Sequence, residues 1–113
     1  MNSINLIGRL TGDPERRGDG EHGPIAVLRL AVPRRRGTED GAVFVNVVCF
    51  GRQAEVAEEY LHKGRRVAVE GRLEHWEWTG PDGEARSRHE VVAERLQFLD
   101  ARPRAQADEA VEA

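Results

Sequence analysis

Hydrophobic and polar residues alternate along much of the first hundred positions, and a period of two predicts β-strands. The alternation is clear over residues 4–10, 25–32 and 42–50, and it returns in two long stretches that begin at Arg66 and end at Leu99. Residues 16–23 are glycine-rich and charged, and residues 34–41 are polar, so we expect both segments to be loops. The pattern therefore predicts five strands.

One helix is expected between the third and fourth strands. Over residues 53–63, three glutamates fall on one side, while Ala57, Tyr60 and Leu61 fall on the other. Gly64 follows as a candidate C-terminal cap. The last two strands are expected to form a long hairpin around residues 80–83, Gly-Pro-Asp-Gly, a sequence suited to a tight turn.

Five strands and one short helix predict an all-β fold, a small antiparallel barrel that is closed or nearly closed. The chain of 113 residues has room for one domain, which we place at residues 1–100. Residues 101–113 carry no aromatic residue and only Val111 as a large aliphatic one, and are expected to be a disordered tail.

The composition excludes several classes of protein. No apolar run approaches the length that spans a bilayer, and the apolar stretch near the N-terminus is too short for a secretory signal peptide. The single cysteine, Cys49, excludes an internal disulfide framework. A cytoplasmic protein with no membrane partner is therefore expected.

No catalytic motif is recognisable in the sequence: it lacks a phosphate-binding glycine loop that ends in Lys-Ser/Thr, an elbow serine and a His-Glu-x-x-His helix. The four histidines, His22, His62, His75 and His89, lack metal-ligand spacing and have no cysteine cluster beside them. We therefore predict no enzyme, no metal and no cofactor.

The chain has only six aromatic residues. Four of them fall on the side of their strand that faces away from the expected core: Phe44, Phe50, Trp76 and Trp78. Flat rings outside a core suit unpaired nucleobases, because base stacking contributes about 1–3 kcal/mol per base without reading sequence. Two structural alternatives remain open. The tryptophans can pack across the hairpin, and the phenylalanines can fill a barrel layer or an oligomer interface.

The net charge of −3 argues weakly against a nucleic-acid partner, but 16 of the 17 basic residues are arginine, which suits phosphate and flat rings. The cations on outer parities, in loops or on the hairpin are candidate phosphate contacts: Arg29, Arg34, Arg35, Arg36, Arg52, Lys63, Arg72, Arg86 and Arg88. Each one alone is more often a solvated surface residue, and Glu70, Glu74 and Glu77 can neutralise Arg72. Only the whole set indicates a groove.

Four stretches resemble the bacterial single-stranded DNA-binding proteins: INLIGRLTGDPE from Ile4, FVNVVCFGRQAEVAEEYLHKG from Phe44, VAVEGRLEHWEW from Val67 and RSRHEVVAERLQFLD from Arg86. The resemblance covers residues 1–100 in order. It implies an oligonucleotide-binding barrel (OB-fold), binding of single-stranded DNA with little sequence preference, and a homotetramer or a dimer. It also matches the stacking aromatics to Phe44, Phe50 and Trp78, and the cations after these motifs to Arg52 and Lys63.

The chain departs from this family at two places. Arg36 falls where many relatives have a further tryptophan, and its planar guanidinium can partly replace that ring as a stacking surface. Trp76 falls where a basic residue is commoner. The chain also stops at residues 108–113 without the acidic tip ending in Pro-Phe that recruits other replication and repair proteins. A short, nucleoid-associated form that does not recruit partners through this tip is expected.

The sequence thus predicts a non-catalytic protein that binds and protects single-stranded DNA in replication, recombination or repair. Two alternatives are kept: an RNA-binding or primosome-type module on the same barrel, and a purely oligomerising interaction module that buries the rings between subunits.

Overall fold

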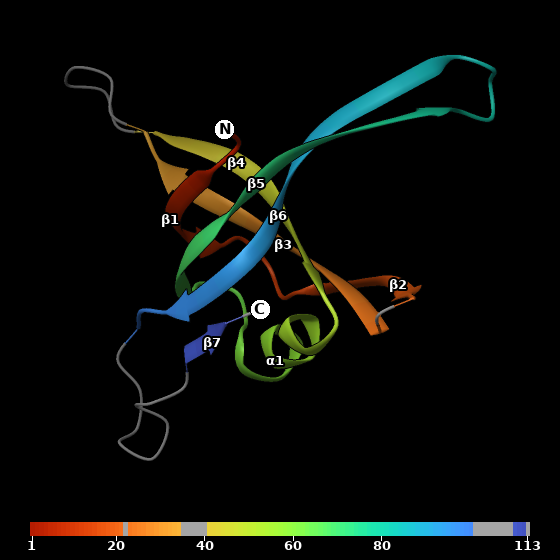
Figure 1. Cartoon of the computed structure of the whole chain (residues 1–113). Helices are drawn as coiled ribbons and strands as arrows, with labels where there is room; N and C mark the ends of the chain where they lie inside the picture. Colours follow the sequence, from red (N-terminus) through yellow and green to blue (C-terminus); the bar gives the residue numbers. More distant parts are fainter. Residues whose placement is uncertain (22, 35–40, 101–109, 113) are drawn as a thin grey trace.

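Figure 1 shows the computed structural model of the chain, which describes residues 1–21, 23–34, 41–100 and the backbone of residues 110–112. In this part of the chain the elements are β1 (Ile4–Leu10), β2 (Glu15–Gly20), β3 (Gly23–Pro33), β4 (Ala42–Phe50), α1 (Arg52–Tyr60), β5 (Arg66–Thr79), β6 (Ala85–Phe98) and β7 (Ala110–Glu112). All five alternating segments form strands, as the sequence pattern predicts.

Five of these strands form a closed ring of hydrogen-bonded neighbours. In the described residues, β1 pairs with both β3 and β5, and the order β5, β6, β4, β3 completes the ring. The pairs are antiparallel except at the junction of β4 with β6, which is parallel and joins Val47 to Val91 and Val48 to Val92. The predicted all-β class with one helix between its third and fourth ring strands is confirmed.

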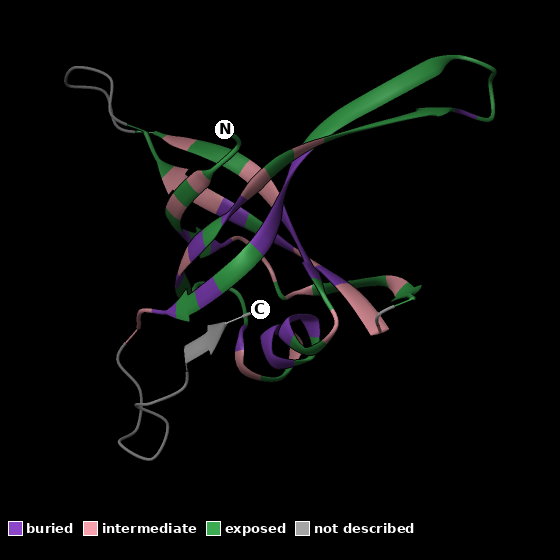
Figure 2. Cartoon of the chain, in the orientation of Figure 1, coloured by how far each residue is buried: buried purple, intermediate pink, exposed green. Residues whose placement is uncertain are grey.

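The core fills the inside of this ring, where the inward parity of the strands places aliphatic side chains (Figure 2). Leu28, Leu30, Val47 and Leu96 are fully buried there, and α1, which buries Ala54 and Ala57, packs against β3 and β4. Cys49 is also buried, and burial raises the pKa of its thiol to about 12. The thiol is therefore protonated and unreactive at neutral pH.

Most of the loop expected at residues 16–23 belongs to the strand β2, which pairs with the start of β3. The pairing shifts register between Arg16 and Gly18, and Gly18 has a positive φ of 141°. Charged residues are tolerated here because β2 is an edge strand with exposed side chains. Arg16 also ties the strand to α1, since its Nε donates to Glu58 at 2.7 Å.

The helix is shorter than expected and is not capped by Gly64. It ends at Tyr60, and Leu61 has extended backbone, with its N–H donating to the Ala57 carbonyl at 2.9 Å. Gly64, with a φ of 91°, lies in the turn that follows and donates its N–H to the Leu10 carbonyl at 2.8 Å. The glycine is therefore part of the turn that leads into β5 and does not end the helix.

Part of the expected disordered tail is a strand. Residues 110–112 form β7, which pairs antiparallel with residues 95–97 of β6. That part of β6 lies beyond the short junction with β4, so its backbone groups on that side are available to a further strand. Residues 101–109 and 113 lie outside the described residues.

The hairpin of β5 and β6 extends beyond the ring (Figure 1). Its turn follows the predicted chemistry: the Gly83 N–H donates to the Gly80 carbonyl at 2.9 Å, and Gly83 has a φ of 80°. Within the described residues, no helix is long and apolar enough to cross a membrane.

Gln53, in the first turn of α1, is buried with both side-chain polar atoms lacking a hydrogen-bond partner in the described structure. A buried polar group without a partner costs about 1–3 kcal/mol. We therefore expect Gln53→Met, which keeps the shape and removes the amide, to raise the free energy of unfolding by about 1 kcal/mol or more in urea melts. An unchanged or lower stability would contradict this expectation.

Candidate nucleic-acid interface

The strand registers place the four predicted rings on one outer face of the sheet, which we call the aromatic face. Phe44 and Phe50 share a parity on β4, with Val48 between them, and Val48 lies beside Val92 of β6. Val92, Glu90 and Arg88 are alternate residues of β6 and lie on the same face of the sheet. Arg88 lies opposite Trp76 on β5. Trp78 follows one alternation further along the hairpin, opposite Arg86.

None of these four rings is sealed in the core. The exposed fractions are 56% for Phe44, 39% for Phe50, 39% for Trp76 and 42% for Trp78. The structural alternative in which the phenylalanines fill a layer inside the strand ring does not hold for this chain. The rings are instead half-exposed, with surface free for a flat partner.

Two of the rings are partly covered by arginines. The Arg29 guanidinium carbon lies 5.3 Å from the centre of the Phe44 ring, and the Arg88 guanidinium carbon lies 5.1 Å from the Trp78 ring. These are cation–π distances. Each pair puts a positive charge and a stacking surface within one side-chain length of each other.

The remaining predicted cations differ in position. Arg72 bonds Glu74 at 3.0 Å and Glu94 at 3.4 Å, so of its three expected partners Glu74 is confirmed, and Glu94 is an additional one. Arg86 binds Asp82 at the hairpin turn. Of the other candidates, Arg34 follows β3, Arg52 begins α1 beside Phe50 and pairs with Glu55 at 3.7 Å, and Lys63 lies in the loop after α1. Arg35 and Arg36 lie outside the described residues.

A buried carboxylate, Glu90, lies among these residues on the aromatic face. Its side chain is fully buried, and Arg17 reaches from β2 to bind both of its oxygens, at 2.8 and 3.0 Å. Arg88 contacts the same carboxylate at 3.4 Å. The Arg17 hydrogen bonds hold the pKa of Glu90 below its ordinary value of 4.5, against the opposing effect of burial. Glu90 thus links β2 to the arginine that covers Trp78.

Because the folded pKa of Glu90 is depressed, the stability it contributes is present above pH 4.5, its unfolded value, and is lost as the pH falls through the folded pKa. Other carboxylates also titrate in this range, so the test compares wild type with Glu90→Gln in urea unfolding from pH 7 to pH 3. We expect wild type to be more stable near neutrality and the difference to shrink below pH 4.5. A difference that stays constant across the range would contradict the assignment.

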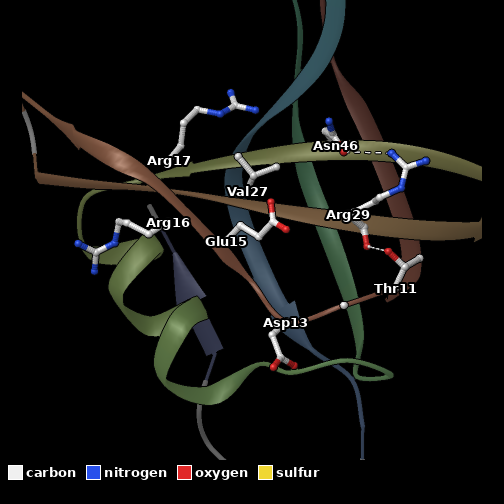
Figure 3. A pocket seen from close by; sticks show the side chains of 9 residues that line it. Thr11, Asp13, Glu15, Arg16, Arg17, Val27, Arg29 and Asn46 are labelled. Carbon is white, nitrogen blue, oxygen red and sulfur yellow. Dashed lines mark hydrogen bonds between the residues drawn. The ribbon is translucent and has the colours of Figure 1, made fainter.

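A pocket of about 540 Å³ lies beside the aromatic face, between β2, β3 and β4 (Figure 3). Its lining residues are Thr11, Gly12, Asp13, Glu15, Arg16, Arg17, Val27, Arg29 and Asn46. Asn46 joins the pocket to the rings, since its Oδ1 accepts a long 3.4 Å bond from Arg29, which covers Phe44. In Figure 3, the Glu15 carboxylate points between Val27 and Arg29, while Arg16 and Asp13 point away.

The histidines form no metal centre in the described structure, where no group of three or more His, Cys, Asp or Glu side chains is placed to hold an ion. His75 and His89 do meet across the hairpin, with ring centres 4.5 Å apart and planes at 19°. This contact follows from their direct pairing in the strand register. His22 lies outside the described residues.

Sequence reasoning missed Arg17, Glu90 and Asn46. Arg17 lies in the loop expected at residues 16–23, so its reach across the sheet cannot be predicted from the sequence, and Glu90 carries no motif that marks it as part of a site. One signal was available: Glu90 shares the parity of Arg88 and Val92 in the alternating pattern. The parity does not reveal that Arg17 covers this position, because that contact spans 73 residues.

Comparisons with known proteins show what the chain is similar to. Residues 1–99 match the model of the single-strand binding protein family. The chain is 41% identical over 107 residues to the single-stranded DNA-binding protein of Helicobacter hepaticus, covering 90% of this chain and 63% of that protein. For the Thermotoga maritima protein of the same name, the values are 43% over 108 residues, 91% and 77%.

A solved structure is similar as well. The chain matches a structure titled Plasmodium falciparum SSB complex with ssDNA, with a TM-score of 0.75, 27% identity, and coverage of 88% of this chain and 96% of that one. The OB-fold implied by the sequence resemblance is thereby confirmed. The chain spans about 63% to 65% of the length of the first two curated relatives it matches, from Helicobacter hepaticus and Wolinella succinogenes.

Proposed function

The chain belongs to the single-strand binding protein family, and from this premise we propose that it binds single-stranded DNA with little sequence preference and without a catalytic step. The bases stack on Phe44, Phe50, Trp76 and Trp78. The phosphates contact Arg29, Arg34, Arg35, Arg36, Arg52, Lys63, Arg72, Arg86 and Arg88.

The observation that carries this proposal is the common exposure of four aromatic rings on one face of the sheet, two of them with a guanidinium beside the ring. Exposed rings are costly to leave without a partner, and single strands offer unpaired flat bases. At those two rings, the arginine supplies a phosphate contact next to the stacked base. Similarity to proteins that are named for single-stranded DNA binding supports the same reading.

The direct test is a titration of intrinsic tryptophan fluorescence with thymidine oligomers. Trp76 and Trp78 are the two tryptophans of the chain and both lie on the aromatic face, so stacking should quench most of the emission. A matched uridine oligomer in competition separates the RNA-binding alternative. Unquenched emission together with no binding in a gel shift would favour the oligomerising module, in which the rings are buried between subunits.

The salt dependence of binding is expected to be shallow. Several of the arginines on the aromatic face already have carboxylate partners, whereas Arg29, Arg34 and Lys63 have none within 4 Å in the described structure. These three contacts at about −0.7 each contribute about −2 to the slope of log K against log salt on single strands, and Arg35 and Arg36, which lie outside the described residues, can add about −1.4. The slope is measured by repeating the titration from 50 to 400 mM NaCl. A slope several times steeper would mean that the paired arginines also release counterions.

We also propose that the chain assembles into a homotetramer, with a dimer as the alternative. Ile7 on β1 and Val43 on β4 are exposed aliphatic residues away from the four rings, and they provide apolar surface for such contacts. Light scattering on the purified chain measures the mass directly.

We also propose a cytoplasmic, nucleoid-associated role in replication, recombination or repair, since that is where single-stranded intermediates form.

A further inference from the structure

The aromatic face divides into two arms at Glu90. The parallel pairing of β4 with β6 begins at Val47 and Val91. Before these residues, β4 carries Phe44, while β6 runs with β5 in the hairpin that carries Trp78, and the two strands diverge (Figure 1). Glu90 immediately precedes Val91. Its buried side chain therefore lies at the point where the β4 arm and the hairpin arm separate.

On the hairpin arm, Glu90 holds Arg88. The Nε atom of Arg88 lies 3.4 Å from Oε1 of Glu90, and its guanidinium carbon lies 5.1 Å from the centre of the Trp78 ring. In the strand register Arg88 is opposite Trp76, so it reaches Trp78 diagonally. Because the contact uses Nε, the two terminal nitrogens remain to donate to a phosphate oxygen. Arginine has many rotamers, and the carboxylate selects the one beside the ring.

The β4 arm is connected to the same carboxylate through Asn46. The Asn46 side chain hydrogen-bonds to Glu90, and its Oδ1 accepts a 3.4 Å bond from Arg29 (Figure 3). A carboxylate can only accept, so the amide nitrogen of Asn46 is the group that donates to Glu90. Arg29 in turn lies over the Phe44 ring, at 5.3 Å. One carboxylate is thus connected to the guanidinium beside a ring on each arm.

The depth of Glu90 decides which charges a bound strand meets here. The Glu90 side chain is 0% exposed, whereas the two arginines that share it, Arg17 and Arg88, are 33% and 45% exposed. One negative charge is therefore buried beneath two positive ones, and the guanidiniums face outward. A carboxylate in this position holds cations in place and does not itself meet the phosphates.

We propose that Glu90 is a positioning residue for single-strand binding, which holds Arg88 beside Trp78 and, through Asn46, holds Arg29 beside Phe44. The proposal rests on the proposed function and adds residues that act on the strand only through these two arginines. A side chain that is in place before binding does not have to be ordered by the strand. Ordering one such side chain corresponds to about 2-fold to 10-fold in Kd.

Glu90→Gln keeps the shape of the side chain and removes its charge. A negative charge that merely lay near the strand would make this variant bind more tightly, so the direction of the change is informative. We expect the anisotropy of a fluorescein-labelled thymidine strand to show binding weaker by at least about 4-fold, about 2-fold for each arginine. Glu77→Gln, which removes an exposed charge from the opposite face of the same hairpin, is the control and should bind at least as tightly as wild type.

A chain without the two arginines separates positioning from a general loss of structure. When Arg29→Ala and Arg88→Ala are both present, Glu90→Gln should weaken binding no further. An equal loss in both backgrounds overturns the proposal, and so does a Glu90→Gln chain that binds as tightly as wild type. Should thermal melts show that Glu90→Gln does not fold, Asn46→Ala decides. It should weaken binding about 2-fold or more when Arg29 is present and leave Kd unchanged in the Arg29→Ala chain, and any other pattern overturns the proposal.

Acrylamide quenching tests the position of Arg88 without DNA. In a Trp76→Phe chain, Trp78 is the only tryptophan, and Arg88 covers part of its ring. Glu90→Gln and Arg88→Ala should each raise the quenching constant to a similar extent, with no further rise when they are combined. Unchanged quenching in Glu90→Gln overturns the proposal. Failure of the wild type to bind any thymidine strand overturns the proposed function instead, and the quenching result still shows whether Glu90 places Arg88.

Discussion

Replacing both Phe44 and Trp78 with alanine should weaken binding to thymidine oligomers by about 2–6 kcal/mol, at least about 30-fold in Kd. Each ring is expected to stack one base at about 1–3 kcal/mol. The two residues lie on different strands and have different arginine partners, so their effects should be close to additive. Anisotropy of a labelled thymidine strand measures the loss, since Trp78 itself no longer reports by fluorescence.

The matched control is Leu73→Ala. Leu73 is 43% exposed but lies on the opposite parity of β5, away from the four rings. The substitution removes exposed apolar surface outside the proposed site and should leave Kd nearly unchanged. Thermal melts of all variants check that the fold is intact. A double variant that binds as tightly as wild type would remove these rings from the site.

Arg17→Ala should lower the free energy of unfolding by about 3 kcal/mol, because removing one partner of a buried ion pair leaves the other charge without compensation. The Glu90 side chain is fully buried, and Arg17 supplies both of its short contacts. We expect the lower end of the usual range because Arg88 remains 3.4 Å from the carboxylate. Urea unfolding at pH 7 measures the change.

Two further variants make this result specific. Arg16→Ala removes the neighbouring arginine, whose pair with Glu58 is more exposed, and should cost less than about 1 kcal/mol. In the double variant Arg17→Ala with Glu90→Gln, no buried charge is left without a partner, so part of the loss should be recovered. Equal losses for Arg16→Ala and Arg17→Ala would contradict the special position of Glu90.

The sequence was sufficient to predict the strands and to place the four aromatic side chains outside the core. Period-two alternation directly encodes which side of a strand faces inward. Phe44 and Trp78 could be assigned to the outer face without knowing which strands pair. The parity rule is local and works wherever a strand is regular. It was less informative at Leu73, which shares the inward parity but is half-exposed beyond the last residue of β5 that pairs with β1.

What the sequence did not reveal depends on contacts between distant residues. The β2 segment contains glycines and charges that are typical of a loop, and it forms a strand because the edge of β3 is available for pairing. The Arg17–Glu90 pair and the pocket at Glu15 both depend on that strand. A loop prediction at residues 16–23 therefore concealed two features at once.

The arginines that cover Phe44 and Trp78 have a consequence for how an acidic chain, with a net charge of −3, can hold a polyanion. In the proposed binding mode, a base that stacks on the part of the ring beneath the guanidinium displaces it, and the displaced cation then has the strand's own phosphate as a new partner. Stacking and charge neutralisation become a single exchange at each such ring. Under the proposed function, local rearrangement of these side chains would let the protein hold the strand without a positive overall charge.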